Sequence, residues 1–281
     1  GFVGKDLLAF DLVLIRCVGV LFSYQSGRLE KAEYFPSFYH FPVPSLSNKA
    51  LESDEFQVSK SLQRLLQEVT MAIGIIEKRS PDYCFLDGSI VPQYADKPRS
   101  DSNILGFYRK LIEEFQLLYE TALKKRCELV ACVEDSRGSR LRTILQQKVL
   151  AGNSQKSKLL DDCYDTVLLD YLLKPGERST AFSYSGEESK RKHPILSDFD
   201  EQWSKSIRAF YLKPCEFDRP LRIEFLHNSG NLSKHVDRIA SVTYAVSSLH
   251  KEYAYPSVLI EADLHARLKP DEISMVYEKI L

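Results

Sequence analysis

Asp87 is the first acidic residue whose surroundings suggest chemistry. It ends YCFLD (83–87), a short run of strand-forming residues, and Gly88 and Ser89 follow it before the chain returns to apolar residues. Asp and Gly favour turns for local reasons, so Asp87 can be a simple turn former. Alternatively, it is a carboxylate at the carboxyl end of a buried strand, where sites collect in α/β sheets. The local pattern leaves both interpretations open.

A second acid, Glu68, lies 19 residues before Asp87. Apolar residues recur at spacings of three and four across 56–76, which predicts an amphipathic helix. Periodicity alone is compatible with Glu68 as a solvated acid, one turn from Arg64 at i and i+4. However, Glu68 stands beside the apolar stripe, and a turn at 78–82 would return Asp87 towards it. This arrangement would place two carboxylates together.

Paired carboxylates suit phosphodiester cleavage with divalent metal ions. Hard cations such as Mn²⁺ or Mg²⁺ prefer oxygen ligands, and two ions about 4 Å apart can activate water and stabilise the leaving oxygen. Such a site needs three or four acids from distant parts of the chain. Because the sequence holds 39 Asp and Glu residues, many acid pairs arise by chance, and the pattern alone is weak evidence.

The composition describes a globular protein with an ordinary charge balance. The chain has 281 residues, 44% hydrophobic and 27% charged, with a net charge of −1. This balance argues against a polycation that coats nucleic acid, but it leaves room for a local basic channel. No apolar run approaches the ~20 residues of a membrane span, and we expect no signal peptide. Six scattered cysteines without a C-x-x-C pair predict reduced core residues in a cytoplasmic protein.

The order of predicted elements indicates an α/β fold with a mixed sheet flanked by helices. A long strand at 8–24, expected to belong to the core sheet, and a returning strand at 30–35 form a hairpin, and the proline-rich 41–47 interrupts the pattern. A ribonuclease H-like core has this order. We expect a single domain, with the core at 1–150, closing strands and helices at 205–281 and a mobile insertion at 185–202. The remaining elements are helices at 56–76, 104–125, 139–150, 159–172, 233–250, 258–268 and 271–280, strands at 83–87, 127–135, 207–212 and 221–226, and polar segments at 96–103 and 152–158.

Motifs along nearly the whole chain resemble the NurA nucleases, partners of the HerA ATPase in prokaryotic DNA end resection. Each motif is modest alone, but their order is specific. They are LLAFDLVLIRCVGVLF (7–22) with YFPS (34–37), LQRLLQEV (62–69), YCFLDGSIVP (83–92), LVACVEDSRGSRL (129–141), LLKPGERSTAFSYS (172–185), RIEFL (222–226) and YPSVLIEADLHARL (255–268).

The resemblance implies a function and partners. It implies a ribonuclease H-like nuclease with 5′→3′ exonuclease and single-strand endonuclease activity, acting in double-strand break repair. It also implies two Mn²⁺ or Mg²⁺ ions per active site, a homodimer around a DNA channel and docking onto a HerA-type hexameric ATPase. An association with the Mre11–Rad50 pathway and a cytoplasmic, nucleoid-associated location in a prokaryote follow from the same resemblance.

Carried over by position, Glu68 and Asp87 match metal ligands of the family, and Asp263 occupies the late-helix ligand position. His265 is a weaker candidate, since a hydrated surface histidine explains it as well. The family's first-strand Asp-Gly-Gly or Asp-Gly-Ser motif is absent, because GFVG passes directly into KDLLAFDL. Either a segment after Gly4 is missing from the sequence, or this member is degenerate and cuts poorly.

Candidate DNA contacts come from two other motifs. Arg137 and Arg140 follow a strand expected beside Asp87 and could reach phosphate. Tyr255 either stacks on a base, orders the site or is a core tyrosine. A non-catalytic DNA-end clamp that serves a hexameric ATPase is the alternative to a nuclease. A haloacid-dehalogenase-type phosphatase is set aside, because it requires an acid two residues after the nucleophile, where this chain has Ser89.

Overall fold

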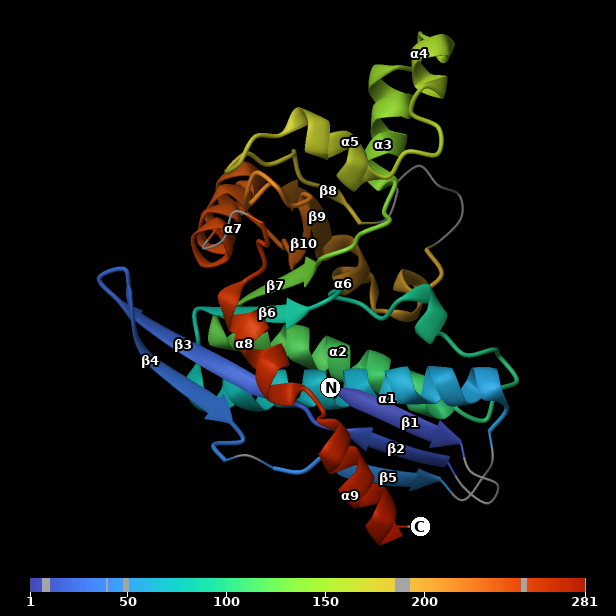
Figure 1. Cartoon of the computed structure of the whole chain (residues 1–281). Helices are drawn as coiled ribbons and strands as arrows, with labels where there is room; N and C mark the ends of the chain where they lie inside the picture. The colour runs from blue at the N-terminus through green and yellow to red at the C-terminus, as the bar shows by residue number, and fades with distance from the viewer. Residues whose placement is uncertain (7–10, 39, 48–50, 185–192, 249–251, 281) are drawn as a thin grey trace.

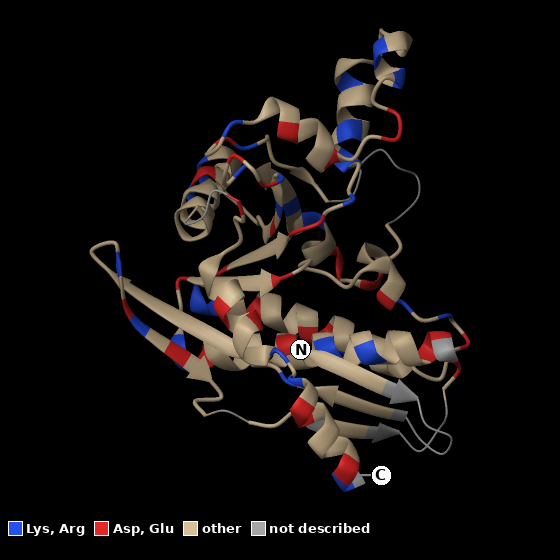
Figure 2. Ribbon diagram, viewed as in Figure 1, with Lys and Arg blue, Asp and Glu red and all other residues tan. Residues whose placement is uncertain are grey.

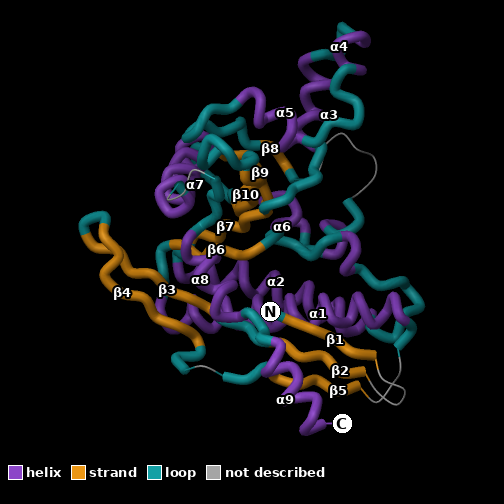
Figure 3. The backbone as a smooth tube through the Cα atoms, viewed as in Figure 1, coloured by secondary structure: helices purple, strands orange, loops and turns teal. Residues whose placement is uncertain are grey.

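The computed structural model describes residues 1–6, 11–38, 40–47, 51–184, 193–248 and 252–280. Within these ranges the chain forms a mixed α/β structure with three sheets (Figures 1 and 3). The strands are β1 Phe2–Asp6, β2 Asp11–Ile15, β3 Gly19–Gln25, β4 Arg28–Phe35, β5 Val43–Ser47, β6 Tyr83–Asp87, β7 Glu128–Val133, β8 Phe182–Ser183, β9 Ile207–Leu212 and β10 Leu221–Leu226. The helices are α1 Ser53–Arg79, α2 Leu105–Lys125, α3 Arg140–Ile144, α4 Ser154–Lys158, α5 Asp165–Leu172, α6 Glu201–Ser206, α7 Leu232–Ser247, α8 Ser257–Ala266 and α9 Pro270–Ile280.

A five-stranded sheet in the order β6-β7-β10-β9-β8 forms the centre of the protein. β6 runs parallel to β7, and the other neighbours are antiparallel. The sequences of β7 and β9 are nearly continuously apolar and buried, as expected for strands covered on both faces. Strand β10 is buried as well, although it carries Arg222 and Glu224. The register places Asp87, the last residue of β6, beside Cys132 of β7. The expectation of a mixed sheet flanked by helices is confirmed.

Helices cover both faces of this sheet. On one face, α1 and α2 pack through a large apolar cluster that includes Leu62, Ile76 and Phe115. On the other face, Val236 of α7 and Leu259 of α8 pack against the sheet. The apolar stripe read between 56 and 76 therefore lies within α1 and faces the core, and the predictions for β6, β9 and β10 match the observed bounds.

The prediction of one long core-sheet strand at 8–24 is wrong. Residues 7–10 lie outside the described part of the chain, but β2 ends at Ile15 and β3 begins at Gly19. The break falls at Arg16, which is buried; its Nη1 donates to the Arg267 carbonyl at 3.0 Å, and its Nη2 pairs with Glu272. Because the guanidinium needs these distant partners, the chain leaves the strand there.

The first strands accordingly form two sheets of their own. β2 lies between β1 and β5, and β3 pairs only with β4 among the described residues. In Figure 1 the β1-β2-β5 sheet lies below α1 and the five-stranded sheet above it. The proline-rich stretch expected to interrupt the pattern contains β5, an edge strand, where proline is tolerated because one side of the strand needs no ladder hydrogen bonds.

Two further segments differ from the sequence predictions. The polar stretch 152–158 contains the short helix α4. In the stretch expected to be mobile, residues 185–192 lie outside the described part. Its second half packs on the core, because Ile195, Leu196 and Phe199 are buried in the apolar cluster beside α1 and α2.

A helical arm follows β7 and is attached to the sheet through Asp165. This carboxylate is fully buried and accepts hydrogen bonds from the backbone N–H groups of Leu141 and Arg142, at 2.9 and 2.8 Å, at the start of α3. The Tyr211 hydroxyl on β9 donates to the same carboxylate at 3.1 Å. Asp165 thus caps α3 and anchors it to the sheet, a role that Asp fills well at a helix N-terminus.

Replacing Asp165 by Ala should lower the free energy of unfolding by about 3 kcal/mol, because buried donors lose a charged acceptor. Urea unfolding followed by circular dichroism measures the loss. The matched control is Asp161→Ala, which removes an exposed carboxylate that accepts one hydrogen bond from Gln146 and should cost less than about 1 kcal/mol. Equal losses in the two variants would contradict the anchoring role.

Candidate functional site

The turn that follows β6 carries an exposed carboxylate on a fixed backbone. Gly88 adopts φ +95°, a conformation that favours glycine, and its N–H donates to the Cys132 carbonyl at 2.9 Å. Asp87 is exposed, while the rest of β6 is half-buried because this strand is at the edge of the sheet. The two interpretations of Asp87 are therefore compatible: the residue starts a turn, and it presents its carboxylate at the sheet's edge.

Tyr255 holds the Asp87 carboxylate from the other side. Its hydroxyl lies 2.7 Å from Asp87 Oδ1 and 2.9 Å from the Cys132 carbonyl, and both are acceptors for its proton. Burial, together with the nearby Cys132 and Asp87, raises the pKa of Tyr255, so the hydroxyl stays protonated and donates. The ring is 6% exposed, which leaves no open face for a stacked base. Tyr255 is thus a core tyrosine, as one of the three interpretations expected, and its hydroxyl is placed to order Asp87.

Glu68 lies near enough to Asp87 for the two charges to interact. Burial of the Glu68 carboxyl raises its pKa; Arg64 opposes this shift, and the Asp87 charge adds to it. Arg64 Nη1 lies 3.0 Å from both Glu68 oxygens, as the i and i+4 spacing predicts. The helix and the strand thus bring the two sequence-predicted acids together, and the Asp87 charge disfavours ionisation of Glu68.

The two late candidates lie on α8. Asp263 is exposed, and its charge acts on the Gly1 amino group, as does that of Glu68, so both acids lie on the same side of the protein. His265 instead packs its ring on Tyr34 of β4 at a centroid distance of 4.5 Å, and its Nδ1 lies 3.5 Å from a Glu261 oxygen. The contact with Tyr34 joins α8 to the β3-β4 ribbon, whereas Glu261 lies on α8 itself.

Sequence reasoning missed an acid on the neighbouring strand end. Glu134 directly follows β7, and burial raises its pKa; hydrogen bonding from Tyr253 opposes the shift, and Asp135, Asp218 and Asp87 add to it. The sequence signal for Glu134 is its place at the end of a strand, because parallel strands end at the same edge of a sheet. In the structure, Glu134 comes two residues after Cys132, the register partner of Asp87. The region around Asp87 is therefore more acidic than the motifs indicated.

The acids suit a hard cation in donor type but not in number. Carboxylate oxygens are the ligands that Mn²⁺ and Mg²⁺ prefer. Among the residues that the structure describes, no group of three or more His, Cys, Asp or Glu side chains is placed to hold a metal ion. Glu68 and Asp87 form a pair, and Asp263 does not complete a ligand group with them. Asp6 and Asp11 face each other in the β1-β2 register, and their side chains lie outside the described part.

A buried ion pair supports the turn from inside the sheet. Glu224 of β10 is 1% exposed; one of its oxygens accepts from Arg222 Nε at 2.7 Å. The other oxygen accepts from Ser89 Oγ at 2.7 Å and from the Ile90 N–H at 3.0 Å. Burial works against the charged guanidinium, but the Glu224 carboxylate, together with Tyr211 and Tyr184, outweighs it and raises the pKa of Arg222. The residues directly after Asp87 are thus bound to a charge in the central sheet.

The candidate DNA-contacting arginines follow β7. Arg137 is exposed in the loop after the strand, and Arg140 is half-buried at the first position of α3. Gly138 lies between them where a Cβ would come within 2.8 Å of Arg222 Nη1 and 2.9 Å of the Tyr211 hydroxyl. Because these are polar atoms of the buried network, the loop packs directly against it and only a residue without a side chain fits.

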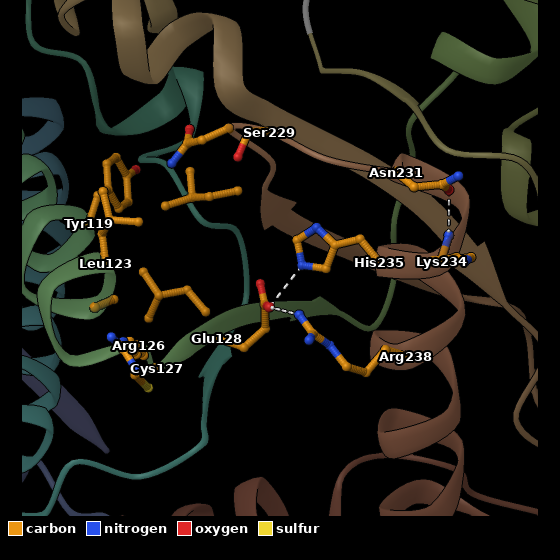
Figure 4. A pocket seen from close by; sticks show the side chains of 14 residues that line it. Tyr119, Leu123, Arg126, Cys127, Glu128, Ser229, Asn231, Lys234, His235 and Arg238 are labelled. Carbon is orange, nitrogen blue, oxygen red and sulfur yellow. Dashed lines mark hydrogen bonds and ion pairs between the residues drawn. The ribbon is translucent and has the colours of Figure 1, made fainter.

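A cavity of about 500 Å³ is lined by Glu128 and by residues of α7 (Figure 4). Glu128 begins β7, whereas Asp87 lies beside Cys132 near the other end of that strand. In the cavity, His235 Nε2 lies 2.8 Å and Arg238 Nη2 3.0 Å from Glu128 Oε2. His227 and His235 approach each other through their Nδ1 atoms at 3.0 Å. None of the acids predicted from the sequence lines this cavity, so it is separate from the candidate site.

A comparison with known families defines the class. The NurA domain model matches residues 9–268, most of the chain. The chain therefore belongs to the NurA family, a family associated with nuclease activity and DNA repair. A search of curated proteins finds no match. None of the helices in the described ranges has both the length and the apolar content that a bilayer crossing requires.

Replacing Glu68 by Gln should raise stability at neutral pH relative to acidic pH. A carboxyl whose folded pKa is raised binds its proton more tightly in the folded state, so ionisation costs folding free energy once the pH exceeds the unfolded pKa. The unfolding free energy of Glu68→Gln minus that of the parent should therefore become more positive from pH 4 to pH 8. A difference that moves the other way would show that the Arg64 pairing outweighs burial.

Glu224→Gln should lower the free energy of unfolding by about 3–5 kcal/mol, because it leaves the Arg222 charge buried and unpaired. Adding Arg222→Met should recover part of this loss, since the uncompensated charge is removed. Ser89→Ala, which removes one hydrogen bond to Glu224, should cost only about 1 kcal/mol. Urea denaturation of the four proteins measures these values, and a double variant less stable than Glu224→Gln would contradict the explanation.

Proposed function

We propose that this protein is a metal-dependent DNA nuclease whose active site includes Asp87 and Glu68. The observation that carries the proposal is the proximity of these two acids, from β6 and α1, in a chain of the NurA family. A carboxyl whose pKa is raised by burial and by a neighbouring carboxylate, as that of Glu68 is, is characteristic of functional sites, since structure alone gains nothing from the repulsion.

A divalent cation, Mn²⁺ or Mg²⁺, gives these acids a chemical role in the proposal. The proposed ligands are oxygens of Glu68 and Asp87, and Asp263 is proposed as a further ligand from its position in the family motif, although the described structure does not group it with the other two. Two such ions would supply a nucleophilic water and offset the charge on the phosphodiester. The protein's own contribution is to hold the ligands: Tyr255 fixes Asp87, and Arg64 fixes Glu68. Arg64 also balances one negative charge of the pair until a cation binds.

The finer features of the family complete the proposal. They are a ribonuclease H-like core, 5′→3′ exonuclease and single-strand endonuclease activity in end resection, a homodimer and docking onto a HerA-type hexameric ATPase. The five-stranded mixed sheet with its acids at one edge supports the fold proposal. An association with the Mre11–Rad50 pathway and a nucleoid-associated location in the cytoplasm belong to the same proposal.

A second candidate function is a DNA-end clamp that serves the ATPase without cutting DNA. The observation in its favour is that the described acids do not form a group of three metal ligands. The clamp would bind DNA in the presence or absence of divalent metal and would leave it intact. Cleavage of DNA by the protein in Mn²⁺ therefore separates the two candidates.

Asp87→Asn should reduce Mn²⁺-dependent DNA cleavage by at least about a hundredfold, because it removes one charged ligand while leaving the turn geometry in place. Gel analysis of labelled single-stranded and double-stranded DNA, with and without EDTA, provides the measurement. Asp82→Asn, five residues earlier and before β6, is the matched control and should cut at the parent rate. Parent-level cleavage by Asp87→Asn would remove this residue from the active site.

A further inference from the structure

Residues 136–160 form the most basic segment of the chain. They contain six Arg and Lys residues and no Asp or Glu, in a protein whose net charge is −1. Acidic pairs border the segment on both sides, Glu134 with Asp135 and Asp161 with Asp162. The six cations are Arg137, Arg140, Arg142, Lys148, Lys156 and Lys158. Charge separation of this kind produces a locally positive electrostatic field, although the net charge of the whole protein is close to zero.

This segment, called here the basic arm (136–160), projects from the body of the protein. It consists of α3, a π-helical turn at Leu145–Val149 and the returning α4 (Figures 1 and 2). Gln146 Nε2 donates to the Ser157 carbonyl and to Asp161 Oδ1, both at 2.9 Å, which ties the outgoing helix to the returning one. The arm is therefore a closed hairpin with a defined shape.

The cations of the arm differ in their burial and in their role. Arg142 Nη1 donates to the carbonyls of Leu160 and Cys163, at 3.3 and 3.1 Å, and closes the base of the arm. Lys148, Lys156 and Lys158 are exposed on the outer part of the arm. A preorganised scaffold that presents exposed lysines loses little conformational entropy when it binds a polyanion.

The arm is attached to the same sheet edge as the acids. It begins after the carboxyl end of β7, next to the strand that ends in Asp87. At the base of the arm, the Asp165 carboxylate accepts a hydrogen bond from the Tyr211 hydroxyl. That hydroxyl lies 3.4 Å from Arg222 Nη1. Arg222 in turn pairs with Glu224, which supports the turn after Asp87. One buried hydrogen-bond network thus fixes the arm and the Asp87 turn relative to each other.

We infer that the basic arm binds the phosphate backbone of nucleic acid and leads the strand towards the acids at Asp87. Exposed lysines with no acid between them suit a repeated phosphate charge, and Asn153, Ser154 and Gln155 add polar groups at the tip. An acidic protein surface is the competing partner for such an arm. The inference deepens the proposed function, because it assigns substrate contacts outside the acid site, but its test does not require cleavage.

The test is DNA binding as a function of salt. The variant Lys148→Gln/Lys156→Gln/Lys158→Gln should bind labelled single-stranded and double-stranded DNA with a salt dependence shallower by about 2–3 in the slope of log K against log salt, since each lost phosphate contact removes about one unit. Fluorescence anisotropy with EDTA, on the Asp87→Asn background, measures binding without cleavage. The matched control, Arg109→Gln/Lys110→Gln/Lys124→Gln, removes three exposed charges from α2 and should keep the slope of its Asp87→Asn parent.

The outcomes separate this inference from the proposed function. The role of the arm would be overturned if the arm variant kept the slope of its parent, or if the α2 control changed its slope equally. It would also be overturned if the arm variant still bound DNA but no longer bound a labelled polyglutamate peptide. Full cleavage by Asp87→Asn would refute the acid site and leave the binding result standing. Circular dichroism melting of the arm variant confirms folding, because all three lysines are exposed.

Discussion

The buried ion pair between Arg222 and Glu224 is the interaction on which the candidate site depends. Moving two charges out of water costs several kcal/mol for each ion, and only good geometry with further hydrogen bonds offsets that cost. Here both oxygens of Glu224 are bonded, one to Arg222 and the other to the Ser89 hydroxyl and the Ile90 N–H. Since the latter two residues directly follow the Asp87-Gly88 turn, the exposed carboxylate of Asp87 stands on a backbone that a core charge fixes.

The same network places opposite charges at one edge of the sheet. Asp87, Glu68 and Glu134 lie close enough for Asp87 to raise the pKa of the other two. The basic arm begins a few residues further along the chain and is bound to the sheet through Asp165 and Tyr211. A polyanion would be attracted by the arm and repelled by the acids, and a divalent cation would offset that repulsion. In the proposed function, the substrate would bind through the arm and react at the acids.

Elements that are determined by local sequence were predicted correctly, and elements that depend on distant residues were not. Helix α1 and strands β6, β9 and β10 were predictable, because periodicity or a continuous apolar run determines them locally. The long strand at 8–24 was not, because its break at Arg16 depends on Glu272 and Arg267, more than 250 residues away. Strand β5 was missed because proline excludes a central strand but not an edge strand, and strand order is a tertiary property.

The sequence by itself determined the candidate acids Glu68 and Asp87, the helix and strand that carry them, and the acid-free basic segment. Only the tertiary structure decided that Tyr255 bonds Asp87 across 168 residues, that Glu224 supports Ser89 across 135, and that Glu134 joins the acidic region while His265 packs on Tyr34. The physical reason is that apolar periodicity shows which side of an element is buried but not which other element covers it. The partners of a buried polar group are fixed only when the whole core has packed, since each group must then find its donor or acceptor inside the protein.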